Sequence, residues 1–147
     1  MKVVDKIIGV LVLLFSVMVI AQNQTGRITT DFNANWNFRL GDYPTAIESN
    51  FDSSDWRKLQ LPHDWSIEGN FRPDNPSGHQ GGLLPGGMGW YRKKFSLTDI
   101  GGKKFFIEFD GVYKNSTVYI NGNEIGTRPY GYATFQYDMT PYIQEGE

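Results

Sequence analysis

The sequence predicts an all-β fold, and three observations support that prediction. Short segments of alternating apolar and polar residues recur from residue 31 to the end, and Gly, Pro, Asn and Asp separate them. No stretch of roughly twelve residues carries the apolar stripe of an amphipathic helix. Asn121-Gly122 lies between two alternating segments and supplies the positive φ angles that a two-residue hairpin turn requires.

Length and composition predict a soluble protein with one core. The chain has 147 residues, 39% hydrophobic and 20% charged, which leaves room for one complete domain. A net charge of -2 provides no electrostatic footprint for nucleic acid or an anionic membrane surface, so we expect a neutral or weakly charged partner. Cysteine is absent, which excludes thiol catalysis by this chain and leaves core burial and strand pairing to hold the fold.

Residues 1–21 are predicted to be a secretory signal peptide. Lys2 and Lys6 precede an almost unbroken aliphatic run that ends in small residues, and cleavage is expected after Ala21. The run is shorter than the roughly 20 apolar residues that cross a bilayer. An uncleaved membrane anchor is the alternative, but polar residues follow at once without a basic cluster. We therefore expect an exported protein, periplasmic or extracellular, with no membrane attachment after cleavage.

The mature chain is expected to begin with an exposed lead-in, residues 22–30, followed by one β domain, residues 31–147. Residues 33–40 form the first predicted strand, with Trp36 and Phe38 on one face. A polar turn over residues 52–56 follows, and Phe51 and Trp56 are expected to close over the edge of the core.

Two further strands are predicted in the middle of the chain. Residues 91–97 alternate apolar and polar positions with one exception, which indicates a half-buried strand. Residues 104–110 place Phe105, Ile107 and Phe109 on one side and Phe106 on the other, so this segment is the best candidate for a central strand.

The last predicted strand covers residues 132–139, and Thr140-Pro141 ends it because proline has no amide proton to donate. The polar ending, residues 144–147, is typical of a turn that leads into another strand. On this interpretation the domain is incomplete at its carboxyl end and leaves a sheet edge unpaired.

A glycine-rich loop spans residues 79–89. Its glycine density indicates either a backbone of unusual shape or close approach to another group. A flexible surface loop is the alternative.

Three clusters combine aromatic and polar side chains, which is what a sugar site needs: flat apolar faces for the ring and planar polar groups for its hydroxyls. For each aromatic residue, core packing is the competing explanation. The clusters are His63-Asp64-Trp65, Trp90-Tyr91-Arg92, and Arg128 with Tyr130 and Tyr132.

Asp64 is the polar residue that packing explains least well. A carboxylate between His63 and Trp65 would be costly to bury unless it met a donor. It could pair with Arg92, cap a turn, or bind a sugar hydroxyl. His63 and His79 are the only histidines, too few and too isolated in sequence to predict a metal site.

No catalytic residue is predicted in this chain. Glycoside hydrolysis needs a pair of carboxyl groups, and none of the 16 acidic residues lies in a motif that marks such a pair. No serine lies in a glycine-flanked nucleophile motif either. We expect no cofactor in this chain.

Three blocks, LPHDWSIEG (61–69), GWYRKKF (89–95) and FDGVYKNSTVYINGNEIGTRPYGY (109–132), resemble the amino-terminal sugar-binding domain of glycoside hydrolase family 2. The resemblance is greatest to the exported bacterial β-galactosidases of the family and runs from about residue 33 to the end. It implies a jelly-roll-like antiparallel β-sandwich of the galactose-binding-domain type. It also implies an immunoglobulin-like sandwich and a TIM barrel in the same polypeptide, with both catalytic glutamates in the barrel.

The resemblance further implies that the loop over residues 84–89 approaches the galactose-binding pocket. Asp64 and Trp90 are the two residues predicted to lie near a galactoside or related glycan. The family also includes β-glucuronidases and β-mannosidases, so galactoside is a preference. A free-standing carbohydrate-binding module and a purely structural domain remain as alternatives.

Overall fold

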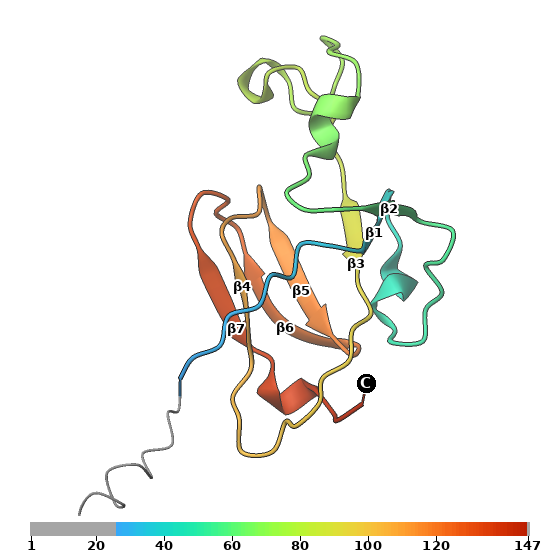
Figure 1. Cartoon of the computed structure of the whole chain (residues 1–147). Helices are drawn as coiled ribbons and strands as arrows, with labels where there is room; N and C mark the ends of the chain where they lie inside the picture. The colour runs from blue at the N-terminus through green and yellow to red at the C-terminus, as the bar shows by residue number, and fades with distance from the viewer. Residues whose placement is uncertain (1–25, 147) are drawn as a thin grey trace, which may run out of the picture. The chain divides into compact units, whose positions relative to one another are not determined.

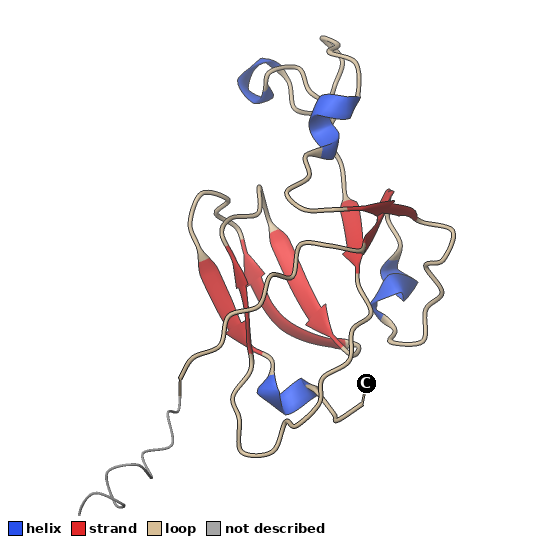
Figure 2. Ribbon diagram, viewed as in Figure 1, coloured by secondary structure: helices blue, strands red, loops and turns tan. Residues whose placement is uncertain are grey.

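The computed structural model describes residues 26–146, and strands dominate it, which confirms the all-β prediction (Figures 1 and 2). Residues 26–32 contain no regular element, and the strands all lie in the unit that begins at Asn33. The strands described are β1 (Trp36–Leu40), β2 (Arg57–Leu59), β3 (Gly89–Arg92), β4 (Phe106–Phe109), β5 (Ser116–Ile120), β6 (Asn123–Arg128) and β7 (Phe135–Asp138). The helical elements described are short 3-10 turns: η1 (Pro44–Ile47), η2 (Trp65–Glu68), η3 (His79–Gly81) and η4 (Thr140–Tyr142).

Strand β1 is the middle of an antiparallel three-stranded sheet, with β2 on one edge and β3 on the other. Phe38 is its central residue and lies opposite Arg57 of β2 and Tyr91 of β3. Its side chain is buried, as the alternation along residues 36–40 predicts. The long connection between β2 and β3 therefore leaves from one edge strand of this sheet and returns to the other.

Strands β5 and β6 form the predicted hairpin. Asn121 and Gly122 have φ angles of 48° and 81°, the positive values that the tight turn requires. The register shifts between Val118 and Tyr119, which marks a β-bulge in β5. Strands β4 and β7 form a separate antiparallel pair beside this hairpin (Figure 1).

Aromatic side chains join the sheets. A Cβ atom on Gly126 of β6 would lie 2.2 Å from the Tyr137 ring of β7, so only glycine permits this approach. Trp90 of β3 stacks on Tyr119 of β5 with ring centroids 6.4 Å apart. The buried apolar side chains that make the core are Phe38, Ala46, Trp56, Ile120, Phe135 and Met139.

The strand predicted over residues 91–97 is wrong in its extent. Strand β3 runs from Gly89 to Arg92, and its pairing with β1 ends at Asn37 opposite Arg92. Beyond that point β1 has only Trp36 left, and no strand within residues 26–146 pairs with residues 93–97. The alternation over residues 91–97 therefore extends beyond the pairing of β3 with β1, and the Leu97 carbonyl instead accepts from the Gly146 amide at 3.0 Å.

The prediction of a central strand over residues 104–110 is also wrong. Strand β4 covers only Phe106–Phe109 and pairs with β7 alone. Phe106 points away from the core and is 50% exposed. Aromatic and apolar side chains on both faces of this segment led to the prediction of a central strand. In the structure only the face with Ile107 and Phe109 is covered.

Two other local predictions are confirmed. Trp56 is buried, and its ring lies 5.5 Å from that of Phe51, so the two close the core edge as expected. The last strand ends before Thr140-Pro141, where η4 begins.

Among residues 26–146 no helix is long and apolar enough to cross a membrane. The predicted signal peptide lies outside the described residues.

Candidate functional site

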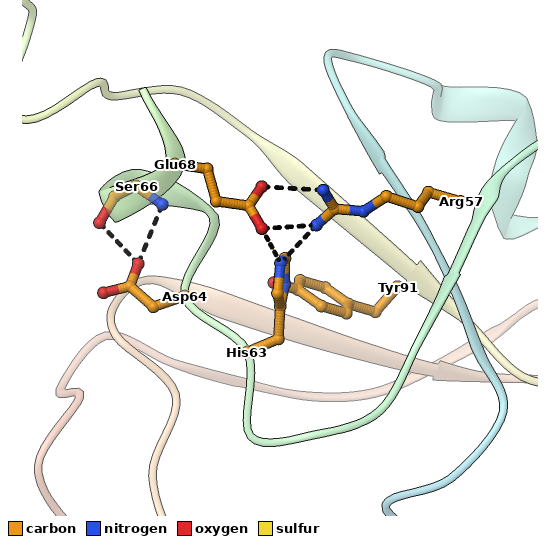
Figure 3. Close-up of polar contacts among 6 residues, drawn as sticks. All are labelled: Arg57, His63, Asp64, Ser66, Glu68 and Tyr91. Atoms are coloured by element: carbon orange, nitrogen blue, oxygen red, sulfur yellow. Dashed lines mark hydrogen bonds and ion pairs between the residues drawn. The ribbon is translucent and has the colours of Figure 1, made fainter. Parts of the chain in front are cut away.

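The block over residues 61–69 follows β2 and contains η2, and four of its polar side chains lie near one another in Figure 3: His63, Asp64, Ser66 and Glu68. Asp64 is the residue that begins η2: its Oδ1 accepts hydrogen bonds from the Ser66 backbone N at 2.9 Å and from Ser66 Oγ at 2.6 Å. The carboxylate thus caps a turn, which was one of the two structural roles predicted for it. Its second oxygen makes no hydrogen bond to any described residue, and the side chain is exposed.

The other structural role predicted for Asp64, an ion pair with Arg92, is wrong. Arg92 extends from β3 in another direction and donates to backbone carbonyls of residues 46, 48, 49 and 51. Five donors on a guanidinium match such a set of carbonyls, so Arg92 ties η1 and the segment that follows it to β3.

His63 lies at the centre of a polar network that joins β2, η2 and β3 (Figure 3). Its Nδ1 is 2.8 Å from Tyr91 Oη, and its Nε2 is 3.1 Å from Glu68 Oε1 and 2.6 Å from Arg57 Nη2. An imidazole nitrogen carries either a proton or a lone pair, so Nε2 donates to Glu68 or accepts from Arg57 but not both. Arg57 also donates to both oxygens of Glu68, at 2.9 and 3.0 Å.

Charge and burial shift two pKa values in this network. Hydrogen bonds from Arg57, and then from His63, hold the pKa of the Glu68 carboxyl below its usual value. Burial, and secondarily the negative charge of Asp64, raises the pKa of the Tyr91 phenol to about 12. At neutral pH Glu68 is therefore ionised and Tyr91 is neutral, so neither is poised for proton transfer.

The Phe38 ring packs against three members of the polar network around His63. The Phe38 ring lies 4.9 Å from the His63 ring and 4.8 Å from the Tyr91 ring, and the Arg57 guanidinium lies 5.3 Å from its centre. Trp65 packs across β3, because a Cβ atom on Gly89 would lie 2.9 Å from Trp65 Nε1. Glycine at position 89 is thus needed for this close approach.

An open groove of about 490 Å³ runs beside this cluster. Its aromatic lining residues are Trp65, which is partly exposed, and Phe38 and Trp56, which are buried. Two ion pairs lie along it, Arg39 with Asp55 at 2.5 Å and Arg57 with Glu68 at 2.9 Å. Aromatic faces beside fixed polar groups are the features that the sequence analysis sought for a sugar site.

Trp90 and Asp64, the two residues predicted to lie near substrate, do not contact one another. Neighbouring residues on a strand face opposite ways, and here Tyr91 faces His63 whereas Trp90 faces Tyr119. Asp64 is close enough to Tyr91 to raise its pKa. The Trp90 ring is partly exposed, and its Nε1 is buried without an acceptor among the described residues.

The glycine-rich loop before β3 is held in shape by hydrogen bonds. Asn75 Nδ2 donates to the carbonyls of Asn70 and Leu83, at 2.9 and 2.6 Å, and Ser77 Oγ donates to the Leu84 carbonyl. Leu83 and several glycines have positive φ angles, so the backbone has the unusual shape that the glycine density predicted. The loop packs back on the site where Pro85 meets Gly69.

Arg57 and Glu68 are site residues that the sequence analysis missed. Glu68 lies in the first of the three blocks, five residues after His63. A predicted turn between these two residues would have indicated that their side chains meet. Arg57 and Tyr91 come from strands far apart in the chain, and only the sheet register brings them to the same place.

Comparison with known proteins places this arrangement in a family. Residues 29–147 match the profile described as "Glycosyl hydrolases family 2, sugar binding domain". The chain is 58% identical over 122 residues to a protein named Beta-galactosidase BoGH2A from Bacteroides ovatus, covering 82% of this chain and 14% of the relative. It is 47% identical over 130 residues to a putative beta-glucuronidase from Formosa agariphila, covering 88% of this chain and 13% of the relative.

Solved structures agree with the sequence comparison. The crystal structure of a beta-glycosidase from Bacteroides vulgatus matches with a TM-score of 0.77 and 48% identity, covering 82% of this chain and 16% of that one. The chain thus spans only a small part of the length of the relatives it matches. It belongs to the sugar-binding domain of the family 2 glycosyl hydrolases.

Proposed function

We propose that this chain is the amino-terminal, non-catalytic domain of an exported family 2 glycoside hydrolase that cleaves terminal β-galactosides. A relative with 58% identity is named a β-galactosidase, and this chain corresponds to 14% of it. The remaining polypeptide would hold an immunoglobulin-like sandwich and a TIM barrel with the catalytic glutamates. This domain would support their fold and shape the substrate pocket.

The behaviour of the site carboxylates supports a non-catalytic role. Of the two carboxylates that Figure 3 draws, Glu68 gives both oxygens to Arg57, and Asp64 gives one to Ser66. A glycosidase acid needs a raised pKa, whereas the pKa of Glu68 is lowered. Glu68 is therefore unsuited to be the general acid of a glycosidase.

The geometry of Asp64 is the observation that carries the proposed role in substrate binding. Ser66 orients the carboxylate through Oδ1, so Oδ2 is an exposed acceptor that is already held in place. A sugar hydroxyl donating to it would form a charge-assisted hydrogen bond. Trp90 follows directly after the loop over residues 84–89, and we assign both that loop and the indole to the wall of the galactose pocket.

The test uses the polypeptide encoded by the whole reading frame and an aryl β-galactoside. Asp64→Ala should lower kcat/KM by about 10- to 100-fold, the loss expected for one hydrogen bond to a charged group. Asp52→Ala is the matched control, because Asp52 also caps a serine two residues on, Ser54, at 2.9 Å. An unchanged kcat/KM in Asp64→Ala would remove Asp64 from the site.

A β-glucuronidase is the second candidate, because the relative at 47% identity bears that name. The residues that distinguish the two sugars would lie outside this domain. Comparing turnover of aryl β-galactoside and aryl β-glucuronide by the same preparation decides between them. A protein that binds either sugar but cleaves neither would instead be a carbohydrate-binding module.

Export rests on the amino-terminal segment alone. The basic start and the aliphatic run before Ala21 predict cleavage there and release to the periplasm or medium. Amino-terminal sequencing of the protein recovered outside the cytoplasm should begin at Gln22. A sequence that begins at Met1 in a membrane fraction would support an uncleaved anchor.

A further inference from the structure

Three exposed tyrosines form a cluster at one end of the strands. Tyr113, Tyr130 and Tyr132 are 67%, 58% and 75% exposed. The Tyr132 ring contacts both others, with centroids 5.3 Å from Tyr113 and 5.9 Å from Tyr130. Contiguous exposed aromatic surface of this kind marks an interaction site more often than chance placement.

The cluster differs from the one that the sequence indicated. Arg128, grouped there with Tyr130 and Tyr132, turns toward the interior and lies over the buried Phe135 ring at 5.9 Å. Tyr113 takes its place, brought in from the β4–β5 loop. Lys114, the next residue, lies with its Nζ 5.6 Å from the Tyr113 ring centre.

Two loops are locked together to hold the rings outward. A Cβ atom on Gly131 would lie 2.8 Å from Tyr113 Cα, and one on Gly111 would lie 2.8 Å from the Gly131 carbonyl oxygen. The Asn115 amide donates to the Pro129 carbonyl at 3.3 Å. Backbone contacts this close fix the positions from which the three tyrosines project, so a ligand that binds them has little backbone to order.

The cluster lies at the same end of the fold as the glycine-rich loop. Strands β3, β5 and β7 run in one direction, so the connections that precede them emerge at one end (Figure 1). The connection before β3 carries Asp64 and the loop over residues 84–89, and the connections before β5 and β7 carry the three tyrosines. The tyrosine cluster and the loop assigned to the galactose pocket therefore face the same end of the fold.

We infer that the tyrosine cluster is a stacking surface for the outer sugar units of an oligosaccharide. Phenol rings offer flat faces to the CH faces of pyranose rings, and their hydroxyls donate and accept hydrogen bonds. The choice of a glycan, and of a galactoside in particular, rests on the proposed function. Protein surface from the same polypeptide is the competing occupant.

The experiment compares two substrates of the full-length polypeptide, a galacto-oligosaccharide of at least four units and an aryl β-galactoside. Tyr132→Ala should raise KM for the oligosaccharide about tenfold and shift KM for the aryl galactoside less. Tyr132→Phe keeps the ring and should change the oligosaccharide KM by less than about threefold. Phe106→Ala, which truncates an exposed aromatic on β4, is the control and should change neither KM.

Thermal unfolding of the same variants separates the two occupants. Equal losses on both substrates, together with a lowered unfolding temperature in Tyr132→Ala, would show that the cluster packs against protein and would overturn the inference. Unchanged kinetics in Tyr132→Ala would also overturn it.

If the full-length polypeptide cleaves neither substrate, the proposed function fails by itself. Calorimetric titration with the same oligosaccharide then tests the cluster. Binding that Tyr132→Ala weakens and Phe106→Ala preserves supports the inference, and absence of binding contradicts it.

Discussion

Asp64 binds Ser66 twice through a single oxygen, accepting from the backbone amide at 2.9 Å and from the hydroxyl at 2.6 Å. One side chain thereby starts η2 and keeps its second oxygen turned outward (Figure 3). Asp64 thus caps η2 with one oxygen and leaves the other as an exposed hydrogen-bond acceptor. Substitutions can separate the two, because asparagine keeps the capping oxygen but loses the charge.

Asp64→Ala should lower the free energy of unfolding of this chain by about 1 kcal/mol, the usual effect of losing an N-cap acceptor. Asp64→Asn should lower it by less, because the amide oxygen still accepts from the Ser66 backbone. Chemical denaturation of both variants measures the difference. Equal losses in the two would show that the cap is not what Asp64 contributes to stability.

Glu68→Gln should make the free energy of unfolding less sensitive to acidic pH. The pKa of Glu68 is lowered in the folded chain, so its contribution is present above its unfolded value of about 4.5 and is lost as pH falls through the folded value. The wild-type chain should therefore lose stability more steeply below pH 4.5 than the variant does. Parallel denaturation curves from pH 6 to pH 3 would contradict the ion pair with Arg57.

Trp90→Phe should change the free energy of unfolding by less than about 1 kcal/mol, because phenylalanine keeps a ring against Tyr119 and the lost N–H has no acceptor among the described residues. Trp90→Ala removes the ring and should cost about 3 kcal/mol. Denaturant midpoints of the two variants test this. A large loss in Trp90→Phe would mean that the indole N–H is bonded in solution.

Gly122→Ala should destabilise the chain by about 1 kcal/mol, because residue 122 has a φ of 81° that alanine adopts only with strain. Gly101→Ala is the control: an added Cβ there meets nothing within 4 Å, and its φ is not positive. Thermal melts of the two variants give the comparison. If both melt at the same temperature, the turn does not need glycine.

The features that the sequence predicted correctly are set by short stretches of chain. Asn121-Gly122 fixes a hairpin through its own φ preferences, and Asp64 with Ser66 two residues on forms a cap without help from distant residues. The buried Phe38 follows from alternation over five residues.

The features that it could not predict depend on which strands meet. Alternation over residues 91–97 gave no sign that the pairing of β3 with β1 stops at Arg92, and the aromatic run before Asp110 did not show that β4 has one partner. The network around His63 likewise needs Arg57 and Tyr91 from the two edge strands of one sheet. Long-range pairing decides these positions, and sequence periodicity carries no information about the partner.

The assignment to the non-catalytic domain of a galactosidase is tested by comparing two preparations on an aryl β-galactoside: the polypeptide encoded by the whole reading frame, and residues 22–147 alone. We expect the whole polypeptide to hydrolyse the galactoside and residues 22–147 to show no turnover. Hydrolysis by residues 22–147 would contradict the non-catalytic assignment, because it would place catalytic carboxylates in a chain assigned none. Binding without hydrolysis by both preparations would contradict it as well and would identify a carbohydrate-binding module.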